Sequence, residues 1–207
     1  MLYSIAAAIL RLYYKLFFFY TKEGLENIPS DGGFLICPNH QSFNDPPLVA
    51  SILKRRLTFL AKEELFKKGI ANWFLKSVGA VPVDRSGGSL RAMRVCMNLL
   101  KDGHALMLFP EGTRFCKHLD DVKPGAVMFA IKSQVPVIPV GISRMKLFGG
   151  TKVRFGKPIY YDEFYGKKVT GDEYKKLTDR LMFEIFSLVD DKCCYYDEIK
   201  DSVSNAD

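Results

Sequence analysis

The 207-residue sequence lacks the glycine-rich signatures of three common α/β enzyme classes. It contains no G-x-S-x-G nucleophile elbow, no G-x-x-x-x-G-K-[ST] phosphate loop and no G-x-G-x-x-G dinucleotide motif. The sequence therefore lacks the usual evidence for a serine hydrolase, a P-loop nucleoside triphosphatase or a nicotinamide-dependent dehydrogenase.

Cysteine is scarce, and its arrangement suits neither a disulfide framework nor a metal site. The five cysteines are odd in number and include no C-x-x-C pair, and two of them, Cys193 and Cys194, are adjacent. This pattern is typical of a reduced, intracellular protein, and zinc-ligand spacing is absent.

Acidic residues are outnumbered, with 30 Lys and Arg against 23 Asp and Glu for a net charge of +7. The last eleven residues, from Asp197, hold four acids and one lysine, so the preceding chain carries +10. A basic body indicates an anionic partner, which composition leaves open among a membrane surface, a phosphorylated substrate and nucleic acid. With 48% hydrophobic and 26% charged residues, the chain is neither disordered nor a polytopic membrane protein.

Polar residues are almost absent from the first 20 positions, where the exceptions are Ser4, Arg11 and Lys15. A helix of this length reaches ~30 Å, but each mid-segment cation would cost ~2.5–3.5 kcal/mol near the centre of a bilayer. The segment's aromatic side chains favour the interface, so we predict a helix lying in the membrane surface. The alternative is a helix packed on the body. No cation precedes the apolar run and no A-x-A site follows it, which argues against a secretory signal peptide.

Short apolar runs alternate with helical periodicity along the rest of the chain. Helices are predicted to begin at Pro46 and to cover 89–100, 125–132 and 172–189. The predicted buried strands are 34–37, 57–61, 80–83, 105–109 and 137–142.

This alternation predicts an α/β fold with a mixed, largely parallel sheet flanked by helices. The length suits one globular body, and no internal repeat or low-complexity linker interrupts it. We place the N-terminal apolar membrane-interface helix at residues 1–28 and the catalytic domain at residues 29–207.

Among the histidines, His40 has the setting that most suggests chemistry. It follows a predicted strand, and ligands in open α/β sheets bind beyond the carboxyl ends of strands. A turn would bring the carboxylate of Asp45 to one imidazole nitrogen and leave the other free as a general base. The alternative is that Asp45 caps the helix beginning at Pro46 while His40 bonds a loop carbonyl. His104 and His118 are expected to be structural or solvated.

Cationic residues follow the ends of three other predicted strands. Arg114 shares a glycine-containing turn with Glu111, and Arg85 and Lys62 each follow a strand of their own. Arginine holds phosphate in a bidentate manner. Each cation alone is more often a solvated surface charge, but their shared position favours an anion site. Because no Ser or Cys nucleophile has a recognisable setting nearby, the nucleophile is expected to belong to the substrate.

These motifs together resemble the glycerolipid acyltransferases, which acylate glycerol phosphate or lysophosphatidate. Four blocks appear in the family's order over roughly half of the chain. Residues 39–46 resemble the family's His-x-x-x-x-Asp block, 79–85 its second motif, 109–114 its third and 135–141 its fourth. Residues 59–65 also resemble the stretch that supplies a phosphate-binding lysine.

The resemblance implies transfer of an acyl group from a thioester of CoA or acyl carrier protein to the free hydroxyl of lysophosphatidate, giving phosphatidate. His40 is implied as the general base, with Asp45 supporting it and Glu111 as a further catalytic-site residue. No metal and no organic cofactor is implied, since the acyl thioester is a substrate. The resemblance implies that Lys62, Arg85 and Arg114 hold the acceptor's phosphate. It implies Gly112 and Thr113 as further substrate-binding residues, which shape their loop and offer backbone amides to the phosphate or the oxyanion.

An amphiphilic acceptor implies a monotopic or peripheral enzyme on the cytoplasmic face of a membrane that contains anionic lipids. Phe115 stands where the family often has Ser, which leaves the preferred head group open. One alternative is a lysophospholipid or lyso-aminolipid acyltransferase. Another is a non-catalytic module that binds anionic lipid, although it gives no reason for His40 and Asp45. Nucleic-acid binding is not favoured, because no recognised module appears.

Overall fold

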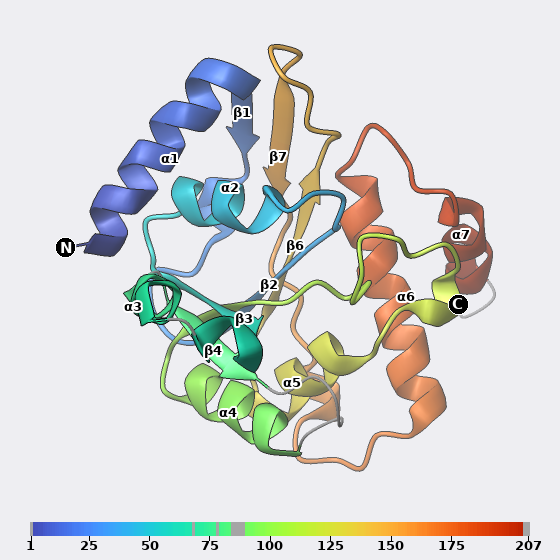
Figure 1. The fold of residues 1–207 in the computed structure, drawn as a ribbon. Helices are drawn as coiled ribbons and strands as arrows, with labels where there is room; N and C mark the ends of the chain where they lie inside the picture. Colours follow the sequence, from blue (N-terminus) through green and yellow to red (C-terminus); the bar gives the residue numbers. More distant parts are fainter. Residues whose placement is uncertain (1, 68, 78, 84–89, 205–207) are drawn as a thin grey trace.

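The computed structural model describes residues 2–67, 69–77, 79–83 and 90–204, which form an α/β layer (Figure 1). Its strands are β1 (Tyr20–Glu23), β2 (Phe34–Pro38), β3 (Leu57–Lys62), β4 (Ala80–Val83), β5 (Ala105–Met107), β6 (Val137–Ile142) and β7 (Thr151–Phe155). Its helices are α1 (Leu2–Phe18), α2 (Asp45–Ile52), α3 (Gly69–Ser77), α4 (Leu90–Lys101), α5 (Gly125–Ser133), α6 (Gly171–Ser187) and α7 (Tyr196–Ser204). Short 3₁₀ helices cover Leu25–Asn27, Glu63–Lys67, Leu119–Asp121 and Asp162–Phe164.

The strands form a sheet in the order β1-β7-β6-β2-β5-β3-β4. Neighbouring strands run parallel except for the antiparallel β6–β7 pair. The predicted mixed, largely parallel sheet flanked by helices is thus confirmed. Because β2 to β6 run in one direction, their carboxyl ends meet at one edge of the sheet, and we call this the carboxyl edge.

The central strand β2 is buried on both faces, which explains its uninterrupted apolar sequence. Phe34 and Ile36 pack with residues of α1 and α2, whereas Leu35 and Cys37 pack with residues of α4, α5 and α6. The alternation follows from the two-residue period of a strand. One sheet therefore supports two hydrophobic cores.

The five predicted strands and the four predicted helices all occur, with ends shifted by one or two residues. The sequence patterns did not predict β1, β7, α3 or α7. β1 is mostly exposed and β7 alternates between buried and less buried side chains, so neither has the continuous apolar run of the central strands. Since β1 pairs with β7, residues 20–23 belong to the sheet, and the division of the chain at residue 28 stays a prediction.

Helix α1 packs on the body along one face and exposes another. Tyr14 and Phe18 are buried against α2, and Arg11 Nε donates a hydrogen bond to the Ser51 carbonyl at 2.8 Å. Packing on the body is therefore confirmed for this face, while membrane contact of the other face stays a prediction. Within the described residues, no helix combines the length and the apolar character needed to cross a bilayer. The apolar side chains exposed on α1 are Ile5, Ile9, Leu12, Leu16 and Phe17, with Tyr13 beside them.

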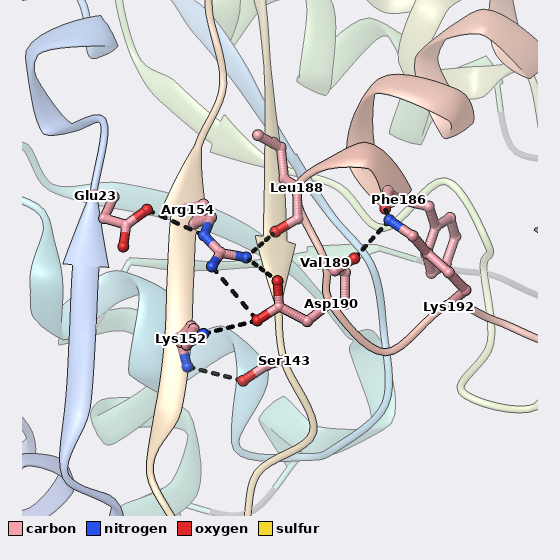
Figure 2. Close-up of polar contacts among 9 residues, drawn as sticks. All are labelled: Glu23, Ser143, Lys152, Arg154, Phe186, Leu188, Val189, Asp190 and Lys192. Atoms are coloured by element: carbon pink, nitrogen blue, oxygen red, sulfur yellow. Dashed lines mark hydrogen bonds and ion pairs between the residues drawn. The ribbon is translucent and has the colours of Figure 1, made fainter.

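Arg154 joins the edge strand β1 and its neighbour β7 to the chain that follows α6 (Figure 2). On β7, its Nε donates to Glu23 of β1 at 3.0 Å, and its Nη1 donates to the Leu188 carbonyl at 2.9 Å. The Asp190 carboxylate accepts from Arg154 Nη1 at 2.8 Å and from Lys152 Nζ at 2.9 Å. These hydrogen bonds from Arg154 and Lys152 lower the pKa of Asp190 to about 2.

We expect Asp190→Asn to lower Tm by about 1–3 °C at pH 6 and by less than half as much at pH 2.5. A carboxyl whose pKa is lowered by folding stabilises the protein above its unfolded pKa near 3.8. That stabilisation is lost as the pH falls from about 4 to about 2. Thermal unfolding of both proteins across this range measures the difference, with Asp191→Asn as the control. An equal difference at pH 6 and pH 2.5 would contradict the assignment.

Candidate active site

A buried asparagine sets the position of His40 at the carboxyl edge. Asn39 has no solvent exposure, and its Nδ2 donates to the Ile142 carbonyl at 3.0 Å. Its Oδ1 accepts from the Ile142 amide at 2.7 Å. Through these two hydrogen bonds, the Asn39 side chain extends the pairing of β2 with β6. The backbone just before His40 is therefore held firmly in place.

The imidazole of His40 contacts the carboxylate of Asp45, with 3.0 Å between Nδ1 and Oδ2. The same oxygen accepts hydrogen bonds from the Gln41 and Ser42 amides, each at 2.7 Å. Only 1% of the Asp45 side chain is exposed, and Asp45 is the first residue of α2, whose N-cap is Asn44. In the neutral imidazole, this contact places the proton on Nδ1, where the carboxylate accepts it, and leaves Nε2 as the unprotonated nitrogen.

The imidazole of His40 lines a cavity. The ring of His40 stacks on Phe109 with centroids 4.0 Å apart, and its side chain is 17% exposed. Strand β5 was predicted to end at residue 109 but ends at Met107. Phe109 therefore lies beyond the strand, in the segment that contacts His40. The cavity has a volume of about 360 Å³, within the range of small-molecule sites. Its lining residues are His40, Pro46, Phe59, Leu60, Met107, Leu108, Phe109 and Gly112.

A second cavity, almost wholly apolar, adjoins the first. It has a volume of about 190 Å³ and lies among α1, α2, β3 and α3. Pro46 and Phe59 line both cavities. The two cavities therefore share a wall formed by Pro46 and Phe59, and the second cavity extends from that wall to the inner face of α1.

Glu111 fixes the backbone of His40. Its carboxylate accepts from the His40 amide at 2.5 Å through Oε2 and from the Tyr195 hydroxyl at 2.6 Å through Oε1. Burial raises the pKa of the Glu111 carboxyl, and the hydrogen bonds from Tyr195 and His40 oppose that rise. No ion pair joins Glu111 to Arg114 among the described residues, so its contacts are those of a positioning residue.

Tyr195 is the residue of this network that the sequence analysis missed. It is 1% exposed, packs edge-on against Phe186 and lies 84 positions from Glu111. Burial, together with the Glu111 carboxylate, raises the pKa of its hydroxyl, so the hydroxyl keeps its proton and acts as a donor. A tyrosine after two cysteines matches none of the motifs, so the sequence carried no signal for it.

Arg114 lies against two exposed aromatic rings beside the His40 loop. The guanidinium carbon is 3.4 Å from the ring centroid of Phe43 and 5.1 Å from that of Phe115. The turn before it contains Gly112 at φ 66°, a left-handed conformation that favours glycine. Thr113 Oγ1 accepts from the Phe115 amide at 3.3 Å, which tightens this turn. Stacking on Phe43 orients the guanidinium while its N–H edge stays available to an anion.

The other two predicted phosphate ligands are not placed. Lys62 is the last residue of β3, at the carboxyl edge, but its side chain lies outside the described part of the structure. Arg85 lies within 84–89, also outside the described residues.

The other two histidines, His104 and His118, make no hydrogen bond, ion pair or ring contact with His40, Asp45, Glu111 or Tyr195 in the described part of the chain. His104 is exposed, and His118 Nδ1 lies 3.3 Å from Glu198 Oε1 in an exposed pair. Both match the predicted structural or solvated role. In the described ranges, no group of three or more His, Cys, Asp or Glu side chains is arranged to hold a metal ion.

A protein-family model described as Acyltransferase matches residues 20–143, more than half of the chain. The chain belongs to the Acyltransferase family. This acyltransferase has the His40–Asp45 pair, Glu111 and Arg114 inside the matched region. The resemblance stated from the four motifs is thus confirmed.

Curated relatives support the assignment. The chain is 34% identical over 146 residues to the 1-acyl-sn-glycerol-3-phosphate acyltransferase of Bacillus subtilis (strain 168), covering 67% of this chain and 73% of that protein. It is 30% identical over 168 residues to the protein of the same name from Streptococcus pneumoniae (strain ATCC BAA-255 / R6), covering 77% of this chain and 62% of that protein.

The acyltransferase is also similar to a solved structure, that of the 1-acyl-sn-glycerophosphate (LPA) acyltransferase PlsC from Thermotoga maritima. The TM-score is 0.68 at 27% sequence identity, and the match covers 90% of this chain and 78% of the other. The predicted fold class is confirmed by this comparison as well.

We expect Tyr195→Phe to lower kcat for acyl transfer by about tenfold and to move the acid limb of the pH–rate profile to higher pH. The Tyr195 hydrogen bond lowers the pKa of Glu111, so its loss lets Glu111 take up a proton at higher pH. Tyr161→Phe is the matched control, because the Tyr161 hydroxyl is also buried but has no hydrogen-bond partner among the residues that the structure describes. The measurement is thiol release from an acyl thioester against pH. Equal losses in both variants, or an unmoved acid limb, would refute this role.

Proposed function

We propose that the acyltransferase transfers an acyl chain from an acyl thioester to the free hydroxyl of lysophosphatidate, giving phosphatidate. The observation that carries the proposal is the buried Asp45 carboxylate on His40 Nδ1, with Nε2 left as a base at the edge of a cavity. The names of the Bacillus subtilis and Streptococcus pneumoniae relatives support the choice of acceptor.

In the proposed reaction, His40 Nε2 removes the proton of the acceptor hydroxyl as its oxygen attacks the thioester carbonyl. A C–O bond forms, the C–S bond breaks, and the leaving thiolate takes the proton from the imidazolium. Asp45 holds the imidazole in the required tautomer and stabilises the imidazolium. A general base of this kind is worth ~10²–10⁴-fold in rate.

The acceptor's phosphate is proposed to bind at Arg114, with Lys62 and Arg85 as further cationic partners. The contact of Arg114 with Phe43 supports this assignment, because a guanidinium held by its face presents its N–H edge. The Thr113 amide is proposed as a further donor next to it, since the Gly112 amide already donates to the Phe109 carbonyl at 3.0 Å.

The thioester's acyl chain is proposed to extend from the His40 cavity past Pro46 and Phe59 into the second cavity beside α1. The lining of the second cavity supports this, since it offers carbon contacts and almost no polar surface. The donor is proposed to be acyl-CoA or acyl carrier protein, used as a substrate.

The enzyme is proposed to act at a membrane surface, as a monotopic or peripheral protein on the cytoplasmic face. Support comes from the exposed apolar face of α1 and from Cys37, Cys96, Cys116, Cys193 and Cys194, which are all free thiols.

We expect thiol release in detergent micelles to require lysophosphatidate and to fall by ~10²–10⁴-fold in His40→Ala and Asp45→Asn. Acyl-CoA and acyl carrier protein thioesters are tested as donors. Glycerol 3-phosphate and lysophosphatidylcholine are offered in parallel as acceptors, and His104→Ala is the control for loss of an exposed histidine.

Release with lysophosphatidylcholine but not with lysophosphatidate would keep the chemistry and overturn the proposed acceptor. No release with any pair, from folded protein that still binds anionic vesicles, would overturn the enzymatic function.

A further inference from the structure

The hairpin between β6 and β7 ends in two exposed apolar side chains. Leu147 and Phe148 are each 60% exposed, although a turn of this kind is normally built from polar residues and glycine. Phe148 has a φ of 56°, a left-handed conformation that is unfavourable for an aromatic residue. Gly149 follows directly and would tolerate such a conformation, so the fold places a phenyl ring here against its backbone preference.

The hairpin tip is attached to the end of α1. The Phe148 amide donates to the Phe17 carbonyl at 2.7 Å. The Phe148 ring lies 5.9 Å from the ring of Phe17 and 6.1 Å from that of Phe19, measured between centroids. Segments about 130 residues apart therefore form one exposed surface at the top of Figure 1. We call this surface the apolar patch; its residues are Leu12, Tyr13, Leu16, Phe17, Phe19, Leu147 and Phe148.

The surroundings of the apolar patch carry positive charge. No Asp or Glu occurs in residues 1–22 or in the hairpin 143–150, whereas Lys15, Arg144 and Lys146 are all exposed. A cavity of about 280 Å³ beside the patch is lined by Arg144, Lys146 and Lys152, and also by Asp190 and Asp191. Apolar side chains with a cationic rim match the surface of a bilayer that contains anionic lipids.

The apolar patch lies at the same end of the sheet as His40. Strand β6 runs parallel to β2, and its last residue, Ile142, pairs with the side chain of Asn39, the residue before His40. The hairpin continues from Ile142 beyond the carboxyl edge. A bilayer that meets the patch therefore lies at the same edge of the sheet as His40.

We propose that the β6–β7 hairpin tip is a second membrane-contact element, which enters the interface of an anionic bilayer together with the exposed face of α1. This inference rests on the proposed function for its purpose, since the acceptor is a lipid, but its test is a binding measurement. A second copy of the chain is the other possible occupant, and the test distinguishes it.

The test compares Leu147→Ser/Phe148→Ser with Tyr160→Ser by co-sedimentation with vesicles of phosphatidylcholine and phosphatidylglycerol. Tyr160 is a matched control: it is 58% exposed but follows Ile159, which pairs with Val137 at the opposite end of β6. We expect the double variant to lose about tenfold or more in vesicle partitioning and the control to lose none. Unchanged partitioning would overturn the proposal. So would a concentration-dependent dimer in solution that the double variant abolishes while vesicle binding is kept.

A depth measurement and an activity measurement complete the test. In Trp73→Phe/Phe148→Trp, the introduced indole is the sole tryptophan, and lipids brominated in the acyl chain are expected to quench it. Absence of quenching with bound protein would overturn insertion. The Leu147→Ser/Phe148→Ser variant should keep wild-type turnover of a short-chain, monomeric lysophosphatidate and lose turnover of the vesicle-bound acceptor. Failure of the wild-type protein to turn over either acceptor would count against the proposed function, while vesicle partitioning and quenching would still decide the hairpin's role.

Discussion

The carboxylate of Glu111 is the contact on which the arrangement of the site depends. It is buried, and its two oxygens accept hydrogen bonds from the His40 amide and the Tyr195 hydroxyl, 71 and 84 residues away in the chain. Burying a carboxylate without such donors has a large unfavourable free energy relative to leaving it in water. The fold is therefore constrained to keep the Glu111 carboxylate, the His40 amide and the Tyr195 hydroxyl together. The loop after β2, the turn after β5 and the chain after α6 are therefore positioned as one unit.

The parallel sheet explains why this unit coincides with the proposed catalytic site. Strands β2 and β5 end at the same edge, so the loops that carry His40 and Glu111 meet without any special folding of either loop. Asn39 ties the first loop to β6, and Asp45 begins the helix that returns over the sheet. Burial of Asp45 under two backbone amides fixes one imidazole nitrogen and exposes the other to the cavity. The rigid strands thus fix the positions of the short loops, and these loops carry the proposed reactive groups.

The central strands, the main helices and the His40–Asp45 pair could be predicted because their signals are local. Continuous apolar runs identify strands buried on both faces. The five-residue spacing allowed both the His40–Asp45 contact and a helix-capping role for Asp45, and the resemblance to the His-x-x-x-x-Asp block favoured the contact. Tyr195, β1 and the hairpin contact with α1 could not be predicted, because each depends on a partner about 80 to 130 residues away. For residues 1–20, composition was compatible with both packing on the body and membrane contact. The structure shows why: one face of α1 is buried against α2, and the other exposes apolar side chains.

The central claim is that Asp45 holds His40 with Nδ1 protonated and Nε2 free to accept a proton. The ring ¹⁵N shifts of histidine-labelled protein test it most directly, because the chain has three histidines and His40→Gln identifies one set of signals. The account predicts, in neutral His40, a protonated Nδ1 and an unprotonated Nε2, and a loss of this preference in Asp45→Asn. A proton on Nε2 of the neutral ring, or the same spectrum in Asp45→Asn, would contradict the assignment of His40 as the general base.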